Sequence, residues 1–62
     1  MIEREIVEVF VNKKVGIVYS DSNRDVYISG ILQKIVGLSL IIDSHDQKIA
    51  LSLECIQKIK EL

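Results

Sequence analysis

The longest hydrophobic stretch of the chain covers residues 26–43 and contains a single charge, Lys34, before its final aspartate. Its length would allow a membrane span, but Lys34 and several polar or glycine positions argue against one, so no membrane partner is expected. The stretch is rich in β-branched residues and contains Gly30 and Gly37, which disfavour one long helix. The pattern predicts two strands separated near Gly37, with a bend at Gly30 in the first.

Shorter segments with alternating apolar positions flank this stretch. Val15–Tyr19 alternates as a strand, and residues 48–53 repeat the pattern. Residues 56–60 predict a short last strand, with a helix over the last seven residues as the alternative. Polar runs at 20–25 and 44–47 are typical of turns because their Asp and Asn side chains hydrogen-bond the nearby backbone.

Residues 2–11 fit either of two patterns. Ile2, Ile6, Val9 and Phe10 have helical spacing, with acidic residues first and lysines after, as the helix dipole favours. Alternation of valines in the same segment would suit a strand. We favour a short helix ending at Asn12, because asparagine tolerates the left-handed conformation.

With only 62 residues, the chain is expected to form a single domain, 1–62, with a thin core. Cys55 is the single cysteine of the sequence, so it cannot form an internal disulfide. One histidine and one cysteine are also too few for a usual structural zinc site, which needs four such ligands. No metal or other cofactor is therefore expected, and self-association is the expected additional source of stability. The lack of a secretory signal and the lone cysteine predict a reducing, cytoplasmic location.

The expected order of elements is one helix followed by five short strands with tight connections. This order predicts a mainly β fold, namely a small, strongly bent antiparallel barrel. The charge balance is eight basic against nine acidic residues, for a net charge of −1. Dedicated nucleic-acid binders are usually strongly basic, so this composition argues against non-specific binding but leaves room for a local basic patch.

Residues 28–42, ISGILQKIVGLSLII, resemble the first motif of the Sm-like family, which includes bacterial Hfq. Residues 48–59, KIALSLECIQKI, are similar to its second motif, where one strand turns sharply into the last. The resemblance implies a five-stranded Sm-like (SH3-like) barrel and a non-enzymatic, RNA-binding subunit of a homo-oligomeric ring. In that family the fourth strand pairs with the fifth strand of the next subunit. The implied interface residues here are Ile49, Leu51, Leu53, Ile56 and Ile59.

The chain departs from the family at the positions that contact RNA. Val36 and Ser39 replace an aspartate and an asparagine, and Leu53 and Glu54 replace the cationic second-motif residues. Leucine cannot neutralise a phosphate, and glutamate repels it. Single-stranded RNA would therefore have to be bound by other residues, for which the candidates are Tyr27, Ser39, His45, Lys13 and Lys14.

The remaining candidate groups have simpler explanations. Tyr27 is either a base-stacking ring or a half-buried strand residue, and Lys13 and Lys14 form either a basic rim or ordinary surface. His45 lies between aspartates, but no motif places a nucleophile beside it, so no catalytic residue is assigned. Cys55 is expected to be a small buried hydrophobe. A barrel that serves as a protein-interaction or assembly module, without nucleic acid, is the alternative function.

Overall fold

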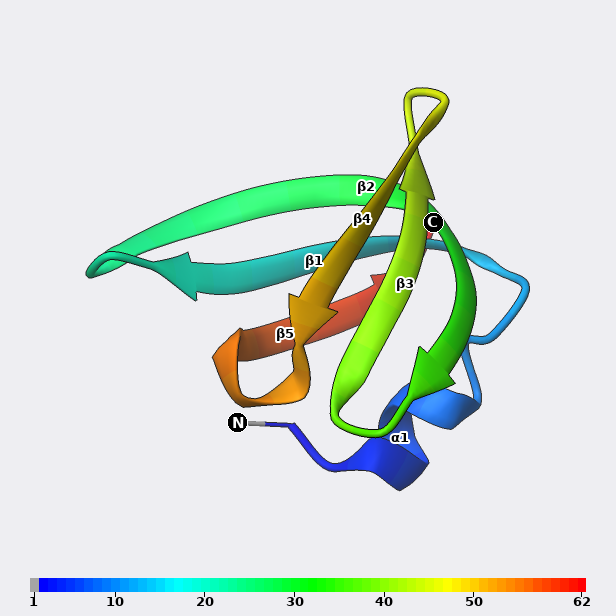
Figure 1. Cartoon of the computed structure of the whole chain (residues 1–62), viewed down its shortest axis with the longest axis horizontal. Helices are drawn as coiled ribbons and strands as arrows, with labels where there is room; N and C mark the ends of the chain where they lie inside the picture. Colours follow the sequence, from blue (N-terminus) through cyan, green and yellow to red (C-terminus); the bar gives the residue numbers. More distant parts are fainter. Residues whose placement is uncertain (1) are drawn as a thin grey trace.

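The chain folds into one five-stranded antiparallel sheet preceded by one short helix (Figure 1). The computed structural model describes residues 2–62. The sheet order is β4-β3-β2-β1-β5, so β4 and β5 are its edges and the sheet is not closed. The mainly β prediction is confirmed, whereas a closed barrel does not form, because β4 and β5 do not pair with each other. The elements are α1 (Arg4–Glu8), β1 (Lys14–Asp21), β2 (Arg24–Val36), β3 (Ser39–Ser44), β4 (Gln47–Ser52), the 3₁₀ turn η1 (Leu53–Cys55) and β5 (Ile56–Glu61).

Strand β2 is shared between two hairpins and is strongly curved (Figure 1). Residues 24–31 pair with β1, and residues 31–36 pair with β3. Gly30 lies just before this change of partner, and a Cβ atom there would overlap the backbone carbonyl of Asp43. A register shift between Leu32 and Lys34 follows, as expected of a bulge that bends a strand. The glycine therefore permits the close approach of β2 and β3 at the bend.

A buried hydroxyl joins the two strands at the same place. Ser44, the last residue of β3, is 3% exposed, and its Oγ donates a hydrogen bond of 2.7 Å to the carbonyl oxygen of Ser29. A buried hydroxyl is costly unless it is hydrogen-bonded. This contact therefore satisfies Ser44 and holds the end of β3 against the bend.

Two of the three β-hairpin tips are two-residue turns with positive φ at both residues. Ser22 and Asn23 connect β1 to β2 with φ angles of 50° and 67°, and His45 and Asp46 connect β3 to β4 with φ angles of 52° and 64°. Positive φ at both central positions is the type I′ geometry, whose twist matches that of the flanking strands. The strands consequently extend further into the predicted polar turns than expected.

The N-terminal helix is shorter than predicted. α1 has five residues, although hydrogen-bonded turns continue to Lys13, whose N–H donates to the carbonyl of Phe10. Asn12 has a φ of 69°, which agrees with its predicted role as the stop. Among the described residues, no helix is long and apolar enough to cross a bilayer.

Nine apolar side chains form the core enclosed by the curved sheet. The helix contributes Val7, which is fully buried, whereas Ile6 and Val9 are 49% and 62% exposed. The helical spacing therefore predicted the helix but not which of its sides is buried. A five-residue helix packs one side against the sheet, and here that side carries Val7 rather than Ile6 or Val9. The core residues are Val7, Val15, Ile17, Leu32, Leu40, Ile42, Leu51, Leu53 and Ile56.

The bend predicts losses of stability of different size at two glycines. In Gly30→Ala the new Cβ meets backbone atoms, including Ser44 Cα at 3.1 Å, which cannot move without shifting a strand. We expect a loss of about 3 kcal/mol in the free energy of unfolding, measured by urea denaturation. Gly37→Ala is the control, because its Cβ has nothing within 4 Å and costs only the strain of φ +59°, about 1 kcal/mol. Equal losses in the two variants would contradict the close approach at Gly30.

Candidate functional site

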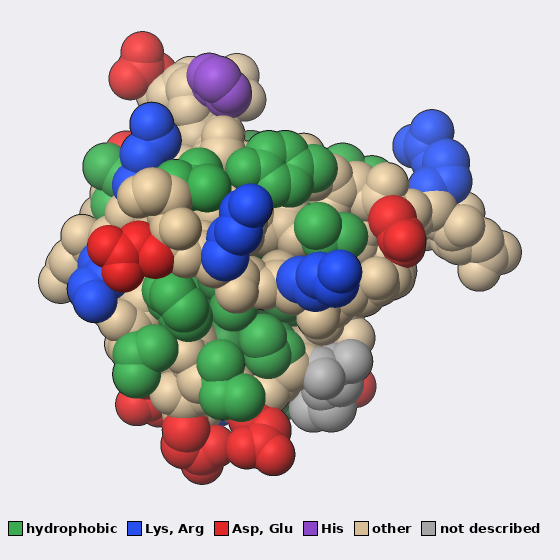
Figure 2. Space-filling model, turned by 180° about the vertical axis from the view of Figure 1, so that it is seen from behind, with side chains coloured by type: hydrophobic (Ala, Val, Ile, Leu, Met, Phe, Trp, Pro, Cys, Tyr) green, Lys and Arg blue, Asp and Glu red, His purple; other side chains and the backbone are tan. Residues whose placement is uncertain are grey.

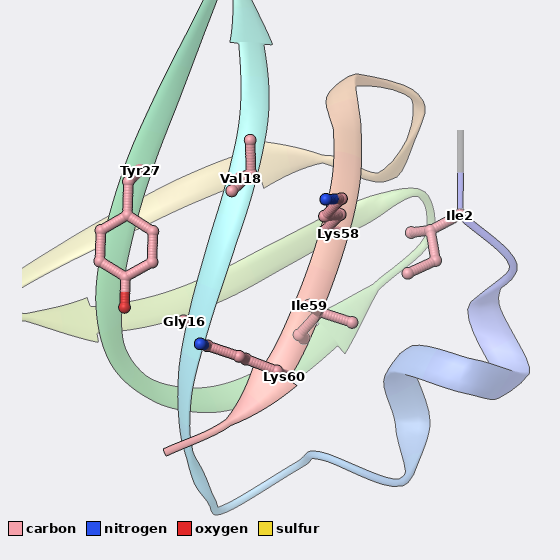
Figure 3. Close-up of a pocket in the computed structure, with 7 residues that line it drawn as sticks. All are labelled: Ile2, Gly16, Val18, Tyr27, Lys58, Ile59 and Lys60. Atoms are coloured by element: carbon pink, nitrogen blue, oxygen red, sulfur yellow. The ribbon is translucent and has the colours of Figure 1, made fainter.

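The outward face of β5, β1 and β2 gathers an aromatic ring and two lysines. In the antiparallel register Val18 lies opposite Tyr27 on β2 and Lys58 on β5, and Gly16 lies opposite Lys60. Directly opposed residues point to the same side of a sheet, and so do positions two apart along a strand. Three strands therefore place Tyr27, Lys58 and Lys60 around Val18 and Gly16, as Figure 3 shows.

These residues line a hollow of about 610 Å³ that is open to solvent. Its apolar part comes from Val18, Ile59 and Ile2, which precedes α1, together with the tyrosine ring. Figure 2 shows this side of the molecule, where Lys and Arg side chains lie among hydrophobic ones. Asp and Glu side chains lie to the left and right of them and gather at the lower end of the view. The volume falls within the range of small-molecule and nucleotide sites.

The position of Tyr27 depends on the absence of a side chain at Gly16. A Cβ at Gly16 would lie 2.5 Å from the tyrosine Oη and 3.1 Å from Cε1 and Cζ. The hydroxyl end of the ring therefore rests on Gly16 of β1. Gly16 is two residues before Val18, which lies directly opposite Tyr27, so the ring reaches diagonally across the two strands. In Figure 3 the ring is seen face-on, with its hydroxyl pointing along the strands toward the level of Gly16. Tyr27 is still 57% exposed, so much of the ring is available to a ligand.

Positive charge dominates this face. Lys14 extends it, because it lies two residues before Gly16 on the same side of β1 and is exposed. Asp25 lies at the hairpin end of the face, where its Oδ1 accepts a hydrogen bond of 2.8 Å from Gln57 Nε2. Gln57 also donates to the hydroxyl of Ser20, which fixes its amide across the strands. Among residues 2–62, this face therefore carries three lysines and one carboxylate, that of Asp25, which is already hydrogen-bonded to Gln57.

Of the five predicted RNA contacts, only Tyr27 and Lys14 lie on the outward face of β5, β1 and β2. Lys13 lies just before β1, and its ammonium is 3.7 Å from the carboxylate of Glu61. Ser39 begins β3, opposite Val36 at the far end of β2. His45 belongs to the β3–β4 turn. Of the five, Tyr27 lines the hollow, whereas Lys13, Lys14, Ser39 and His45 do not.

The predicted interface residues are divided between the core and the two edges of the sheet. Leu51, Leu53 and Ile56 are buried in the core of their own chain, so their side chains are not available to a neighbouring subunit. Ile49 and Ile59 are only partly buried. The groups available to a partner at the edges β4 and β5 are therefore mainly backbone N–H and C=O groups, together with Ile49 and Ile59.

The remaining reactive groups are dispersed. Cys55 is exposed in η1, contrary to the expectation that it is buried, because the 3₁₀ turn directs Leu53 into the core instead. Within residues 2–62 no three His, Cys, Asp or Glu side chains lie close enough together to hold a metal ion.

Comparisons with protein-family models, with curated proteins and with solved structures yield no match for this chain. The role of the face formed by β5, β1 and β2 has to be inferred from its own geometry. Sequence reasoning missed Gly16, Val18, Lys58 and Lys60. The alternation of Lys58 and Lys60 along the last strand is visible in the sequence, but only the register with β1 places them beside Tyr27.

The contact between Gly16 and Tyr27 predicts an energetic coupling. In Gly16→Ala the clash falls on the flexible end of an exposed side chain, so we expect a loss below about 1 kcal/mol in the free energy of unfolding. With Tyr27→Leu already present, the same alanine should cost nothing or stabilise, because glycine weakens a strand. A urea double-mutant cycle should give a coupling of about 0.5–1 kcal/mol. Additive effects would mean that the ring does not rest on Gly16.

Proposed function

We propose that this chain is a non-enzymatic, Sm-like RNA-binding protein that assembles with copies of itself. The observation that carries the proposal is the set of three lysines and one exposed tyrosine on the outward face of β5, β1 and β2. Single-stranded nucleic acid is generally held by cations along the backbone and by rings stacked on bases. The face offers both kinds of group at adjacent positions.

The fold supports the family resemblance. A short helix, five antiparallel strands and a second strand bent at a glycine agree with the Sm-like arrangement that the two motifs imply. The positions that bind RNA in many Sm proteins do not serve here: Leu53 is buried, and Glu54 is exposed but acidic. The proposed RNA contacts therefore lie on a different set of residues.

The two open edges support self-association. β4 and β5 each leave one row of backbone groups without a strand partner within the sheet, and such rows pair readily with another strand. Pairing of β4 with β5 of the next copy would remove both edges and would add stability to a 62-residue core. A homo-oligomeric ring in the cytoplasm is the arrangement we propose.

Exposed apolar side chains favour a second function. Val36 and Leu38, on either side of Gly37, are 55% and 57% exposed. Arg4 of α1 donates a hydrogen bond of 2.7 Å to the Gly37 carbonyl, which fixes this turn against the helix. Apolar groups on a rigid turn suit a protein partner, so an assembly module without nucleic acid is the alternative.

Titration with short U-rich and A-rich RNA tests the proposed function. We expect binding at about 50 mM salt that weakens steeply by about 200 mM, because phosphate contacts release counterions. In Lys58→Gln/Lys60→Gln the slope of log affinity against log salt should fall by about 1.4, or about 0.7 per phosphate contact on a single strand. The matched control is Lys34→Gln/Lys48→Gln, which removes the same charge from exposed lysines outside the hollow. Absence of binding at low salt would favour the assembly module, and equal effects of the two double variants would exclude the proposed face.

The native mass at several protein concentrations tests the assembly. We expect one defined multiple of the monomer mass that persists on dilution, because edge pairing repeated around a ring makes every subunit contact mutually dependent. Native mass spectrometry and sedimentation velocity measure it. A monomer at micromolar concentration would contradict the ring, although it would leave RNA binding by the single chain open to the titration.

A further inference from the structure

We infer that the hollow beside Tyr27 binds single-stranded nucleic acid without selecting either the base or the sugar. One base stacks on Tyr27, and consecutive phosphates lie against Lys58 and Lys60. This inference rests on the proposed function, and it adds which feature of the ligand each residue recognises.

The tyrosine is held ready for stacking before a ligand arrives. Its hydroxyl end is seated on Gly16, at a place where any Cβ would displace it. Its directly opposed neighbour, Val18, is apolar, and Ile59 also lines the hollow. A ring that is already oriented loses less conformational freedom when a base stacks on it. Tyr27 therefore supplies contact area to any base, since every base has a π face.

The two lysines are placed to follow a nucleic-acid backbone. Lys58 and Lys60 lie two residues apart on the same side of β5, or roughly 7 Å at the usual rise of a strand. Consecutive phosphates of an extended strand have a comparable separation. An ammonium binds phosphate as a point charge from many directions, so the two lysines need no particular nucleotide conformation.

Groups able to identify a base or a ribose are scarce here. Among the described residues that line the hollow, the only polar side-chain groups are one phenol hydroxyl and two ammonium groups. Base identity is commonly read by Arg or Lys at guanine, by the paired donor and acceptor of an amide, or by a carboxylate. Here both lysines are assigned to phosphates, and no side-chain amide or carboxylate is among the described residues of the lining. The nearby amide of Gln57 is already hydrogen-bonded to Ser20 and Asp25. The Tyr27 hydroxyl is the only side-chain group among the described residues of this lining that can accept a hydrogen bond from a 2′-hydroxyl.

The test compares RNA and DNA oligonucleotides of the same length and sequence by fluorescence anisotropy at low salt. We expect the affinities for RNA and DNA to agree within about threefold, and A-rich and U- or T-rich strands to differ by less than about tenfold, through stacking strength alone. Tyr27→Phe should retain the affinity, whereas Tyr27→Leu should weaken it about 5- to 150-fold. Circular dichroism establishes that each variant is folded.

Gly16→Ala provides a second, independent readout. It keeps the ring and both lysines but displaces the ring from its seat, so we expect weaker binding with nearly unchanged stability.

The possible failures are distinguishable. A preference of more than tenfold for RNA over the matching DNA, or an unchanged affinity in Tyr27→Leu, would overturn the inference while leaving RNA binding intact. Absence of binding to every oligonucleotide at low salt would overturn the proposed function itself, and the inference with it.

Discussion

The close approach of β2 and β3 at Gly30 is the constraint on which the rest of the structure depends. A straight strand of 13 residues would be roughly 43 Å long, whereas the longest dimension of the molecule is 28 Å. β2 must therefore curve, and it does so where it exchanges β1 for β3 as its partner. A side chain at position 30 would separate the strands at this point, and the hydrogen bond from Ser44 to Ser29 would be lost with the contact.

The curvature also decides which surfaces remain for function. Eight of the nine buried apolar side chains of the core come from the strands and η1, and α1 contributes the ninth, Val7. Among the described residues outside the sheet, Ile2 lines the hollow on the convex side. On the outward side of β2 and β5, Tyr27, Lys58 and Lys60 are exposed and free to contact a ligand.

The sequence contained much of the fold because the strands are encoded locally. Alternation identified the flanking strands, and two glycines within an apolar stretch indicated the bend and the turn. The hairpin tips were less predictable, since Ser22–Asn23 and His45–Asp46 adopt type I′ turns without glycine. The buried face of α1 was also out of reach, because in so short a helix the choice between Val7 and Ile6 depends on contacts with the sheet.

The candidate site was less predictable because it depends on long-range pairing. β1 and β5 are at opposite ends of the chain, and a register shift between Val18 and Tyr19 sets which β5 residues lie opposite Val18. A slip of one residue in this pairing would move Lys58 and Lys60 to the core side of the sheet. No local pattern fixes that register.

The overall charge says little about this face for a related reason. A net charge of −1 averages lysines on the outward face with glutamates on α1 and aspartates near the hairpin tips. At physiological salt, charges on the surface are largely screened beyond about 8 Å. A phosphate beside Lys58 and Lys60 is therefore affected mainly by nearby charges, and the one carboxylate on that face, Asp25, is hydrogen-bonded to Gln57. For a chain this small, the distribution of charge between faces is a better guide to an anionic ligand than the total, and that distribution becomes visible only when the register of the sheet is known.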